Sequence, residues 1–367
     1  MTKPLRVYGS AISYYTGKLE GYLRYKEIAY DFVPLTPLLR RRVRRRTGNG
    51  QMPAVELPDG RFMTDTTPMI EWFEGQYPKP AVIPDDPLQG FMSRLVEDYA
   101  EEWLWRSAMH FRWSYRADAL LLSRRICDEL MTGIPLPGFV KRFLIRLRQH
   151  GGYVQRDGVC RETWDHVEGC YFKTLDQLEA IFAERPYLLG EVPTLADFGF
   201  FAPIFRHFSQ DPTPAEIMRR RAPGVFAWQA RLWNARASRC GGRLVPGIPD
   251  DWAPILGEVG TAYLPSLCAN AQAWKAGQRR HDATIQGVRY RNLLVSQYRV
   301  WCLERLRSHY QALPEGAQAE ARALLEAHAC WQPLWQIDDP DSRYPASETP
   351  FRGRKVHYHN AKERGRS

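Results

Sequence analysis

A proline inside a strand pattern is the feature that most constrains how this chain can fold. Residues 50–55 read GQMPAV, and Pro53 interrupts their short apolar run directly after Met52. Because proline has no N–H to donate to a strand ladder, it marks a sheet edge, a bulge or a cis peptide bond. The pattern predicts strands at 52–57 and 61–64, joined by a Pro-Asp-Gly turn, with a Met52 backbone that faces a ligand.

The next helix start, at Asp65 and Thr66, is expected to form a second wall of the same site. An acid and a hydroxyl ahead of the amphipathic segment 67–77 are an N-cap signal. The free N–H groups of a helix start suit a carboxylate. We therefore expect Met52 and the Asp65-Thr66 pair to face one small anionic ligand.

The N-terminal part of the chain alternates strand and helix patterns. Strands are expected at 5–8 and 29–33, with a helix at 14–25 between them. This βαβ order implies a parallel strand pair covered by the helix. Together with the two later strands and the closing helix, residues 1–80 have the element order of a thioredoxin-like α/β domain.

A proline-rich linker, residues 76–87, leads into a region that is helical in pattern. Residues 88–242 predict an all-α domain, with amphipathic helices at 94–115 and 168–182. Thr194 and Asp197 have the spacing of a capping box that starts a buried helix.

The composition changes after two glycines at 241 and 242. Residues 243–337 predict a mainly helical extension lobe with a hairpin at 283–290. The charged, proline-containing residues 338–367 are expected to form an extended or mobile tail.

Composition and charge bound the class of protein. The 367 residues carry a formal net charge of +10, with arginine runs at 40–46 and 219–221. No aromatic-interleaved motif accompanies these runs, so we expect a solvated basic face rather than a nucleic-acid site. Seven scattered cysteines without a CxxC pair favour a reducing cytoplasm and no metal site. No apolar run of about 18 residues and no signal-peptide pattern occur, so no membrane span is expected.

Four motifs, in order along the chain, resemble those of the cytosolic glutathione transferases. They are VYGSAISYYTGK at 7–18, GQMPA at 50–54, DTTPMI at 65–70 and TLAD at 194–197. In the family they correspond to the opening of the serine-using classes, the cis-proline loop, the acid–hydroxyl pair and a folding box. The resemblance covers about residues 4–240. It implies a thioredoxin-like N-terminal domain and an all-α glutathione-transferase C-terminal domain, followed here by an unusual extension.

The resemblance implies that glutathione is the cosubstrate and that the site is built as follows. The cysteinyl backbone of glutathione pairs with Met52 of the Met52–Pro53 loop, and its γ-glutamyl carboxylate meets Thr66. Asp65 faces the ligand's ammonium. Gln51, with an arginine such as Arg40 or Arg46, meets the glycine carboxylate.

Ser13 is the candidate that activates the thiol, because it lies at the start of the first helix. A hydroxyl and a helix N-terminus both favour a thiolate, which is the reactive species. Tyr8 and Tyr14 are rivals, and Ser13 as a plain helix cap is the alternative. No cysteine precedes Cys127, which excludes a cysteine-based thiol-transferase mechanism at this position.

The second substrate would meet the first helix of the all-α domain. Tyr99, Trp103, Met109, His110 and Trp113 recur there at mixed three- and four-residue spacing, and Tyr99, Trp103 and His110 are the candidates for the pocket. Such a stripe forms either the protein core or a pocket for a large, flat, apolar electrophile.

Three hypotheses for function remain open at this point. The first is a glutathione-dependent transferase, whose reaction is conjugation, ether cleavage or dehalogenation of a hydrophobic small molecule. The second is a non-catalytic binding or regulatory protein that uses the extension for a protein partner. A third assigns RNA or anionic lipid to the arginine-rich surfaces. The resemblance also implies a homodimer, although residues 243–367 could block the dimer face.

Overall fold

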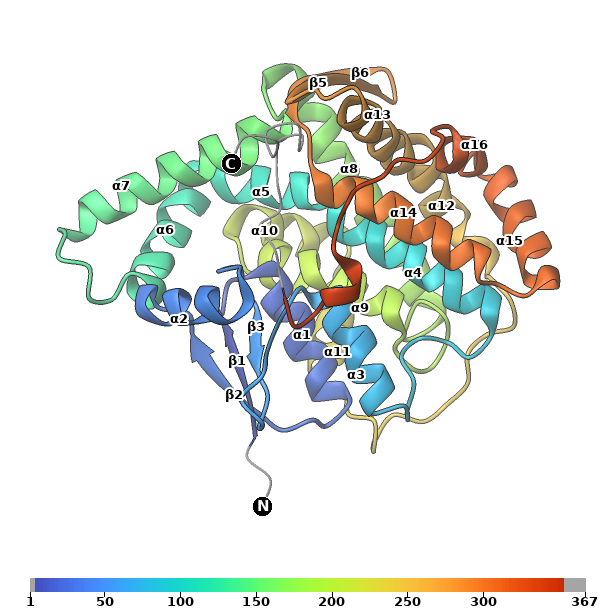
Figure 1. Cartoon of the computed structure of the whole chain (residues 1–367), viewed down its shortest axis with the longest axis horizontal. Helices are drawn as coiled ribbons and strands as arrows, with labels where there is room; N and C mark the ends of the chain where they lie inside the picture. The colour runs from blue at the N-terminus through green and yellow to red at the C-terminus, as the bar shows by residue number, and fades with distance from the viewer. Residues whose placement is uncertain (1–3, 353–367) are drawn as a thin grey trace.

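A four-stranded sheet organises the N-terminal domain of the computed structural model, which describes residues 4–352 (Figure 1). The strand order is β2-β1-β3-β4, and β1 pairs parallel with β2 and antiparallel with β3, which pairs antiparallel with β4. The strands are β1 (Leu5–Gly9), β2 (Tyr30–Pro34), β3 (Ala54–Glu56) and β4 (Phe62–Thr64). The predicted thioredoxin-like α/β fold is thereby confirmed.

The two faces of this sheet are covered by different helices. Alternate residues such as Val7, Val55 and Met63 point to the main core, together with the apolar residues of α1 (Tyr14–Tyr25) and α3 (Thr66–Gln76). The intervening residues, Tyr8, Ala54 and Phe62, pack instead against Val43 of α2 (Pro37–Thr47). The period of two along each strand therefore separates the layers.

Helix α2 was not expected from the sequence. Its residues PLLRRRVRRRT bury only Val43 and Thr47. The arginines lie on the outer side of the helix, so only about one residue in each turn faces the core. Proline near its first turn and Gly48 at its C-cap, with φ 77°, bound the helix.

The all-α domain packs beside the sheet domain. Its helices are α4 (Pro87–Glu102), α5 (Trp105–Ser114), α6 (Arg116–Leu130), α7 (Gly138–Gln149), α8 (Trp164–Glu184), α9 (Leu195–Pro203), α10 (Pro212–Arg221) and α11 (Pro223–Asn234). The single helix expected over 94–115 is divided into α4 and α5. Helices α6 and α7 form an arm that reaches away from the body of the molecule (Figure 1).

The capping box predicted at Thr194 and Asp197 is present at the start of α9. The Asp197 carboxylate accepts hydrogen bonds from the Thr194 N–H at 2.9 Å and from the Thr194 hydroxyl at 3.0 Å. It also accepts from the Leu188 N–H at 3.0 Å, and it is fully buried. Burial raises the pKa of Asp197 to about 6.

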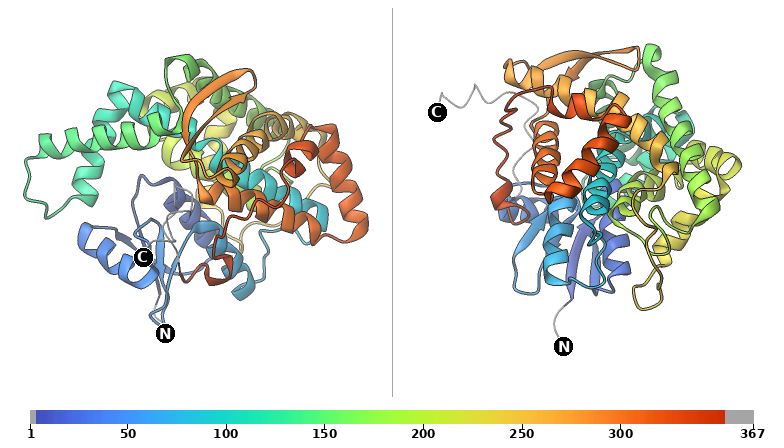
Figure 2. Two further views of the ribbon diagram at one scale, coloured as in Figure 1. Left: turned by 45° about the horizontal axis from the view of Figure 1, so that its top comes forward. Right: turned by 90° about the vertical axis from the view of Figure 1, so that its right-hand side faces the viewer.

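The extension is a helical lobe that packs along α4, as Figure 2 shows from a second direction. Its elements are α12 (Ala253–Glu258), α13 (Leu264–Lys275), β5 (Arg280–Ile285), β6 (Val288–Leu294), α14 (Gln297–Gln311), α15 (Glu315–Ala327) and α16 (Trp331–Trp335). The β5–β6 hairpin is longer than the one predicted. Trp252, which is fully buried, ties the lobe to the all-α domain by donating to the Leu188 carbonyl at 3.0 Å.

Buried charges join the three parts of the chain. Lys18 of α1 lies 2.5 Å from Glu97 and 2.7 Å from Glu101 of α4, with no side-chain exposure at Lys18 or Glu97. Arg305 of α14 completes the cluster, 3.3 Å from Glu97. Burial alone would lower the pKa of Lys18, but the charges of Glu101 and Glu97 outweigh it and the pKa is raised. Because taking these charges out of water is costly, the cluster is weak evidence for added stability, but removing one partner would leave an uncompensated buried charge.

Residues 338–352, which were expected to be extended or mobile, are docked on the rest of the chain. The Ser342 N–H and hydroxyl donate to Glu304, and the Trp274 Nε1 donates to the Asp341 carbonyl at 3.0 Å. The Thr64 N–H of β4 donates to the Pro350 carbonyl at 2.9 Å. The polar composition of residues 338–352 is typical of a solvated segment. The residues that hold this segment are distant in sequence, so the local pattern does not indicate the docking. Residues 353–367 lie outside the described residues.

Candidate functional site

The sheet register brings the predicted site segments to one edge. Tyr8 lies opposite Ala54, and Ala54 lies opposite Thr64. The residues that follow β1, precede β3 and follow β4 therefore leave the sheet at the same end. This edge gathers Ser13, Met52 and Asp65.

The Met52–Pro53 segment presents open backbone at this edge. Its peptide bond is cis, Pro53 is buried and Met52 is partly buried. Within residues 4–352, no group hydrogen-bonds the Met52 N–H or C=O. The neighbouring Gln51 is exposed, and its side-chain oxygen accepts from Asn49 Nδ2 at 2.6 Å. An extended ligand backbone can pair with Met52 as a strand does.

Asp65 occupies a strained position at the start of α3. Its φ is 74°, in the region that favours glycine, and its carboxylate makes no cap hydrogen bond to α3. Instead the Tyr298 and Tyr344 hydroxyls each donate to it at 3.3 Å. Burial raises the pKa of Asp65 to about 6, against the lowering effect of Arg305 and Lys18.

Both tyrosines belong to the extension and were missed by sequence reasoning. Tyr298 lies on α14, and Tyr344 lies in the docked segment 338–352. No local motif identifies either one. Thr66, the partner of Asp65 in the predicted pair, is buried as the first residue of α3.

Ser13 is the N-cap of α1, where its side chain accepts from the Thr16 N–H at 3.4 Å. The Tyr8 hydroxyl lies under α2 and donates to Glu56 at 2.5 Å. The Tyr14 hydroxyl is buried and donates to the carbonyls of Ala100 at 2.9 Å and Glu101 at 3.2 Å. Both rival hydroxyls are thus engaged away from the edge, whereas Ser13 is partly exposed there.

Charged side chains of the all-α domain hold the loop that precedes Ser13. The Glu129 carboxylate of α6 accepts from the Ser10 hydroxyl and from the Ala11 N–H, both at 2.8 Å. The Arg112 guanidinium donates to the Ile12 carbonyl at 2.8 Å. These contacts fix the start of α1, and no sequence motif predicts them.

Among the arginines of α2, Arg40 contacts the loop before Met52. Its Nε donates to the Gly50 carbonyl at 2.8 Å. Arg42 pairs instead with Glu56 at 2.8 Å, and Arg46 is exposed. Arg40 and the exposed Gln51 therefore provide the polar groups beside this end of the site.

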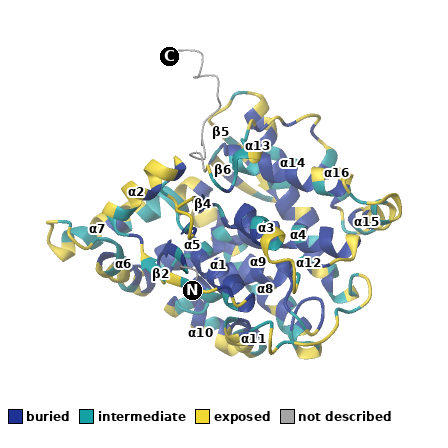
Figure 3. Cartoon of the chain, turned by 60° about the horizontal axis from the view of Figure 1, so that its bottom comes forward, coloured by how far each residue is buried: buried dark blue, intermediate teal, exposed yellow. Residues whose placement is uncertain are grey.

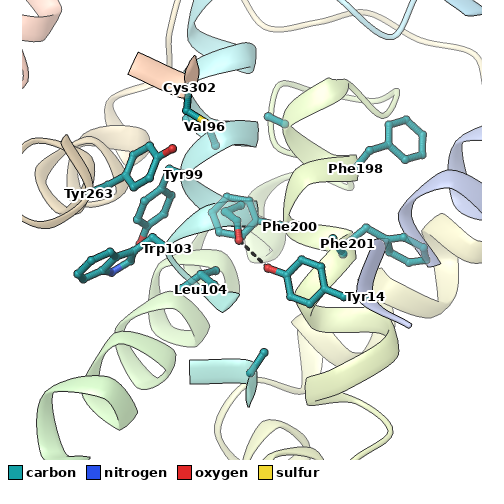
Figure 4. Close-up of a cluster of buried hydrophobic side chains, with 14 of the residues drawn as sticks. Tyr14, Val96, Tyr99, Trp103, Leu104, Phe198, Phe200, Phe201, Tyr263 and Cys302 are labelled. Atoms are coloured by element: carbon teal, nitrogen blue, oxygen red, sulfur yellow. Dashed lines mark hydrogen bonds between the residues drawn. The ribbon is translucent and has the colours of Figure 1, made fainter. Parts of the chain in front are cut away.

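The aromatic stripe of the all-α domain belongs to the core (Figure 4). Tyr99 packs against the rings of Phe200 and Tyr263, and Trp103 is buried with it. His110 is fully buried, with its Nε2 2.9 Å from Glu168, and burial lowers its pKa. In the structure these residues are therefore part of the protein core and do not line an open pocket.

Two surface cavities lie away from these residues. One, of about 290 Å³, is lined by residues that include Cys160, Trp164 and Arg291. The other, of about 410 Å³, is lined by residues that include Tyr187 and Arg231. Within the described part of the chain, no His, Cys, Asp or Glu group is arranged to hold a metal ion. No helix in that part is long and apolar enough to span a membrane.

Comparison with known proteins identifies two parts of the chain. Residues 7–81 match the family model of the glutathione S-transferase N-terminal domain, and residues 161–231 match that of the C-terminal domain. No curated protein matches the sequence significantly.

Solved structures with a similar chain path include three bacterial proteins. Beta-etherase LigF from Sphingobium sp. strain SYK-6 is 22% identical, with a TM-score of 0.44 over 63% of this chain and 95% of that one. A glutathione S-transferase from Rhodospirillum rubrum F11 is 17% identical, with a TM-score of 0.41 over 68% and 97%. A glutathione S-transferase from Methylobacterium radiotolerans, in complex with glutathione sulfonate, is 18% identical, with a TM-score of 0.39 over 66% and 100%.

Proposed function

This chain belongs to the glutathione S-transferase superfamily, and from that premise we propose that it is a glutathione-dependent transferase. In this proposal the glutathione thiolate attacks a hydrophobic electrophile. The observation that carries the proposal is the open Met52 backbone, which lies at the same sheet edge as the N-termini of α1 and α3. An extended anionic peptide finds strand-like pairing and two helix N-termini there.

The γ-glutamyl end of glutathione is assigned to Asp65 and Thr66. The N–H groups at the start of α3 donate to its carboxylate, and the Asp65 carboxylate accepts from its ammonium. The two tyrosine hydroxyls on Asp65 leave lone pairs for that ammonium, since a carboxylate has about four acceptor sites. Gln51 and Arg40 are assigned to the glycine carboxylate.

Ser13 is assigned the activation of the thiol. Its hydroxyl donates to the sulfur, and the N-terminus of α1 favours the negative charge, so the thiol loses its proton to solvent more readily. The sulfur electron pair then forms a bond to carbon, and the leaving group departs with the electrons of the bond that breaks. Conjugation, ether cleavage and dehalogenation all begin with this attack.

The test is glutathione binding by calorimetry, followed by turnover of a model aryl halide. We expect binding at millimolar concentration or tighter and a fall in kcat of roughly 10- to 100-fold in Ser13→Ala, the cost of about one hydrogen bond to a charged group. Asp86→Ala is the matched control, because Asp86 caps α4, accepting from the Gln89 N–H at 2.9 Å, away from the site edge. Absence of binding would refute the proposal.

A non-catalytic binding or regulatory role is the second candidate, and specific observations favour it. The aromatic stripe, which one alternative assigned to the electrophile, is buried in the core, and the cavities lined by Trp164 and by Tyr187 lie elsewhere. In that role the extension, rather than the thiol, carries the function. It predicts that glutathione binds without turnover, or does not bind, and that Ser13→Ala changes neither result.

A further inference from the structure

Helix α7 carries an apolar face that no part of the described chain covers. Phe139 is 69% exposed, Phe143 57% and Leu147 63%, and Leu136 and Leu144 beside them are also exposed. Of the residues of this helix only Ile145 is buried. Figure 3 shows the arm formed by α6 and α7 at the periphery of the molecule, with exposed residues along it. Exposed apolar clusters of this kind mark interaction surfaces.

The exposed apolar side chains form one continuous stripe. At about 100° per residue, Phe139, Phe143 and Leu147 fall within an arc of about 80°, and Leu144 extends it. Ile145 falls on the opposite side, toward α6. Helix α7 therefore has two apolar sides. A narrow one at Ile145 contacts the rest of the protein, and a wider one at Phe139, Phe143 and Leu147 faces outward.

Positive charges border this stripe on both sides. On the same helical projection, Arg142 and Arg146 flank one side, and Lys141 and Arg148 flank the other. The sequence GFVKRFLIRLRQ contains no acidic residue. Among residues 4–352, no carboxylate forms an ion pair with these four cations; Lys141 and Arg146 hydrogen-bond only the Met131 carbonyl and the Ser123 hydroxyl.

We propose that α7 docks this protein on an anionic lipid surface, with Phe139, Phe143 and Leu147 in the boundary between headgroups and acyl chains. A helix that lies in this boundary needs an apolar face and cations beside it, which reach the lipid phosphates. Both features are present on α7. Its 12 residues lie along the surface and do not cross the bilayer.

Charge decides against the other occupants of this face. A two-fold contact between copies of this chain would place α7 cations opposite α7 cations, which is unfavourable. Nucleic acid would pair with the cations but leave the phenylalanines in water. The arginine-rich α2 lies at the same end of the molecule as the arm (Figures 1 and 3), and its exposed Arg41, Arg44, Arg45 and Arg46 add attraction for a negative surface.

The experiment is co-sedimentation of the full chain with vesicles of phosphatidylcholine alone and of phosphatidylcholine mixed with phosphatidylserine. We expect the mixed vesicles to bind at least about tenfold more tightly at low ionic strength, with loss of binding as salt is added. Combined Phe139→Ser, Phe143→Ser and Leu147→Ser should weaken this binding at least about tenfold. Tyr77→Ser is the matched control, because it removes an exposed ring, 45% accessible, from the C-terminal end of α3.

A measurement on the unaltered protein makes the test independent of how the variants fold. Hydrogen–deuterium exchange with and without mixed vesicles should show protection concentrated in residues 134–149. Three results would overturn the proposal: no binding to mixed vesicles at low salt, binding that the triple substitution leaves unchanged, or protection elsewhere. A dimer that the triple substitution dissociates, without vesicle binding, would assign the face to a second copy. RNA binding that is insensitive to that substitution, again without vesicle binding, would assign the basic residues to nucleic acid.

Discussion

Asp65 concentrates several unusual features in one residue. It has a positive φ of 74°, a conformation that costs a residue with a side chain about 1–3 kcal/mol. Its carboxylate is held by two tyrosine hydroxyls at 3.3 Å, and burial raises its pKa to about 6. Strain of this size persists where surrounding contacts impose it. We therefore regard Asp65 as the residue whose charge state governs the proposed site.

The pH dependence of glutathione binding follows from this pKa. Below about pH 6 Asp65 is mainly protonated and cannot pair with the ligand's ammonium, so affinity should fall as pH decreases through 6 and level off above 7. The ligand's own charged groups do not titrate between about pH 5 and 7. Calorimetry over this range measures the effect. Asp65→Asn should bind roughly 10- to 100-fold more weakly at pH 7, with a flat profile; a profile like that of the wild type would contradict the assignment.

Tyr298 and Tyr344 are expected to position Asp65 through their hydroxyls. Since the Tyr344 hydrogen bond lowers the pKa of Asp65, its loss in Tyr344→Phe should raise that pKa and move the acid limb of the binding profile to higher pH. The double Tyr→Phe variant should also bind glutathione up to about tenfold more weakly.

The matched control is Tyr310→Phe, in the same lobe, whose hydroxyl donates to the Gln318 carbonyl at 3.1 Å. An acid limb that stays in place in Tyr344→Phe would show that the tyrosines serve folding only.

At the scale of elements, local signals sufficed wherever a helix or strand carries its own caps and period. The predicted helix at 14–25 coincides with α1, and the capping box starts α9. Helix α2 was not predicted, because only about one residue per turn of this helix faces the core. The single helix expected over 94–115 is two helices, α4 and α5. Packing against other elements of the chain decided both the formation of α2 and the division into α4 and α5. The sequence of the segment alone does not show that packing.

The capping box makes a stability prediction. Asp197→Ala should lower the free energy of unfolding by about 3 kcal/mol, because the buried Leu188 and Thr194 N–H groups lose their acceptor. Asp86→Ala, which removes a single cap bond from α4, should cost about 1 kcal/mol. Urea unfolding of both variants measures the difference. Equal losses would mean that the box is no more than an ordinary cap.

At the scale of the molecule, the extension contacts both the N-terminal domain and the all-α domain and joins them. Arg305 of α14 reaches the Lys18–Glu97 pair between α1 and α4, and the segment at Pro350 pairs with the edge of β4. The surface around α3, α4 and β4 is therefore occupied within one chain. The extension also supplies Tyr298 and Tyr344 to the proposed site.

This arrangement predicts the oligomeric state. The extension covers surface of the all-α domain along α4 and of the N-terminal domain at β4, and these are the two domains that the implied homodimer would pair. We expect the full chain to sediment as a monomer at micromolar concentration in the absence of lipid. A stable dimer under these conditions would show that the extension leaves the interface free.

The sequence by itself determined the fold class and the local parts of the candidate site. A proline after Met52, an acid and a hydroxyl at a helix start, and a serine cap at position 13 are short-range patterns whose conformations depend on neighbouring residues. The tertiary structure alone decided which side chains meet them. Tyr298 and Tyr344 reach Asp65 across 233 and 279 residues, and Glu129 reaches Ser10 across 119. It also decided that the aromatic stripe lies in the core, that residues 338–352 are docked and that the apolar face of α7 is open. Each of these depends on how separate surfaces pack, which no local period or spacing contains.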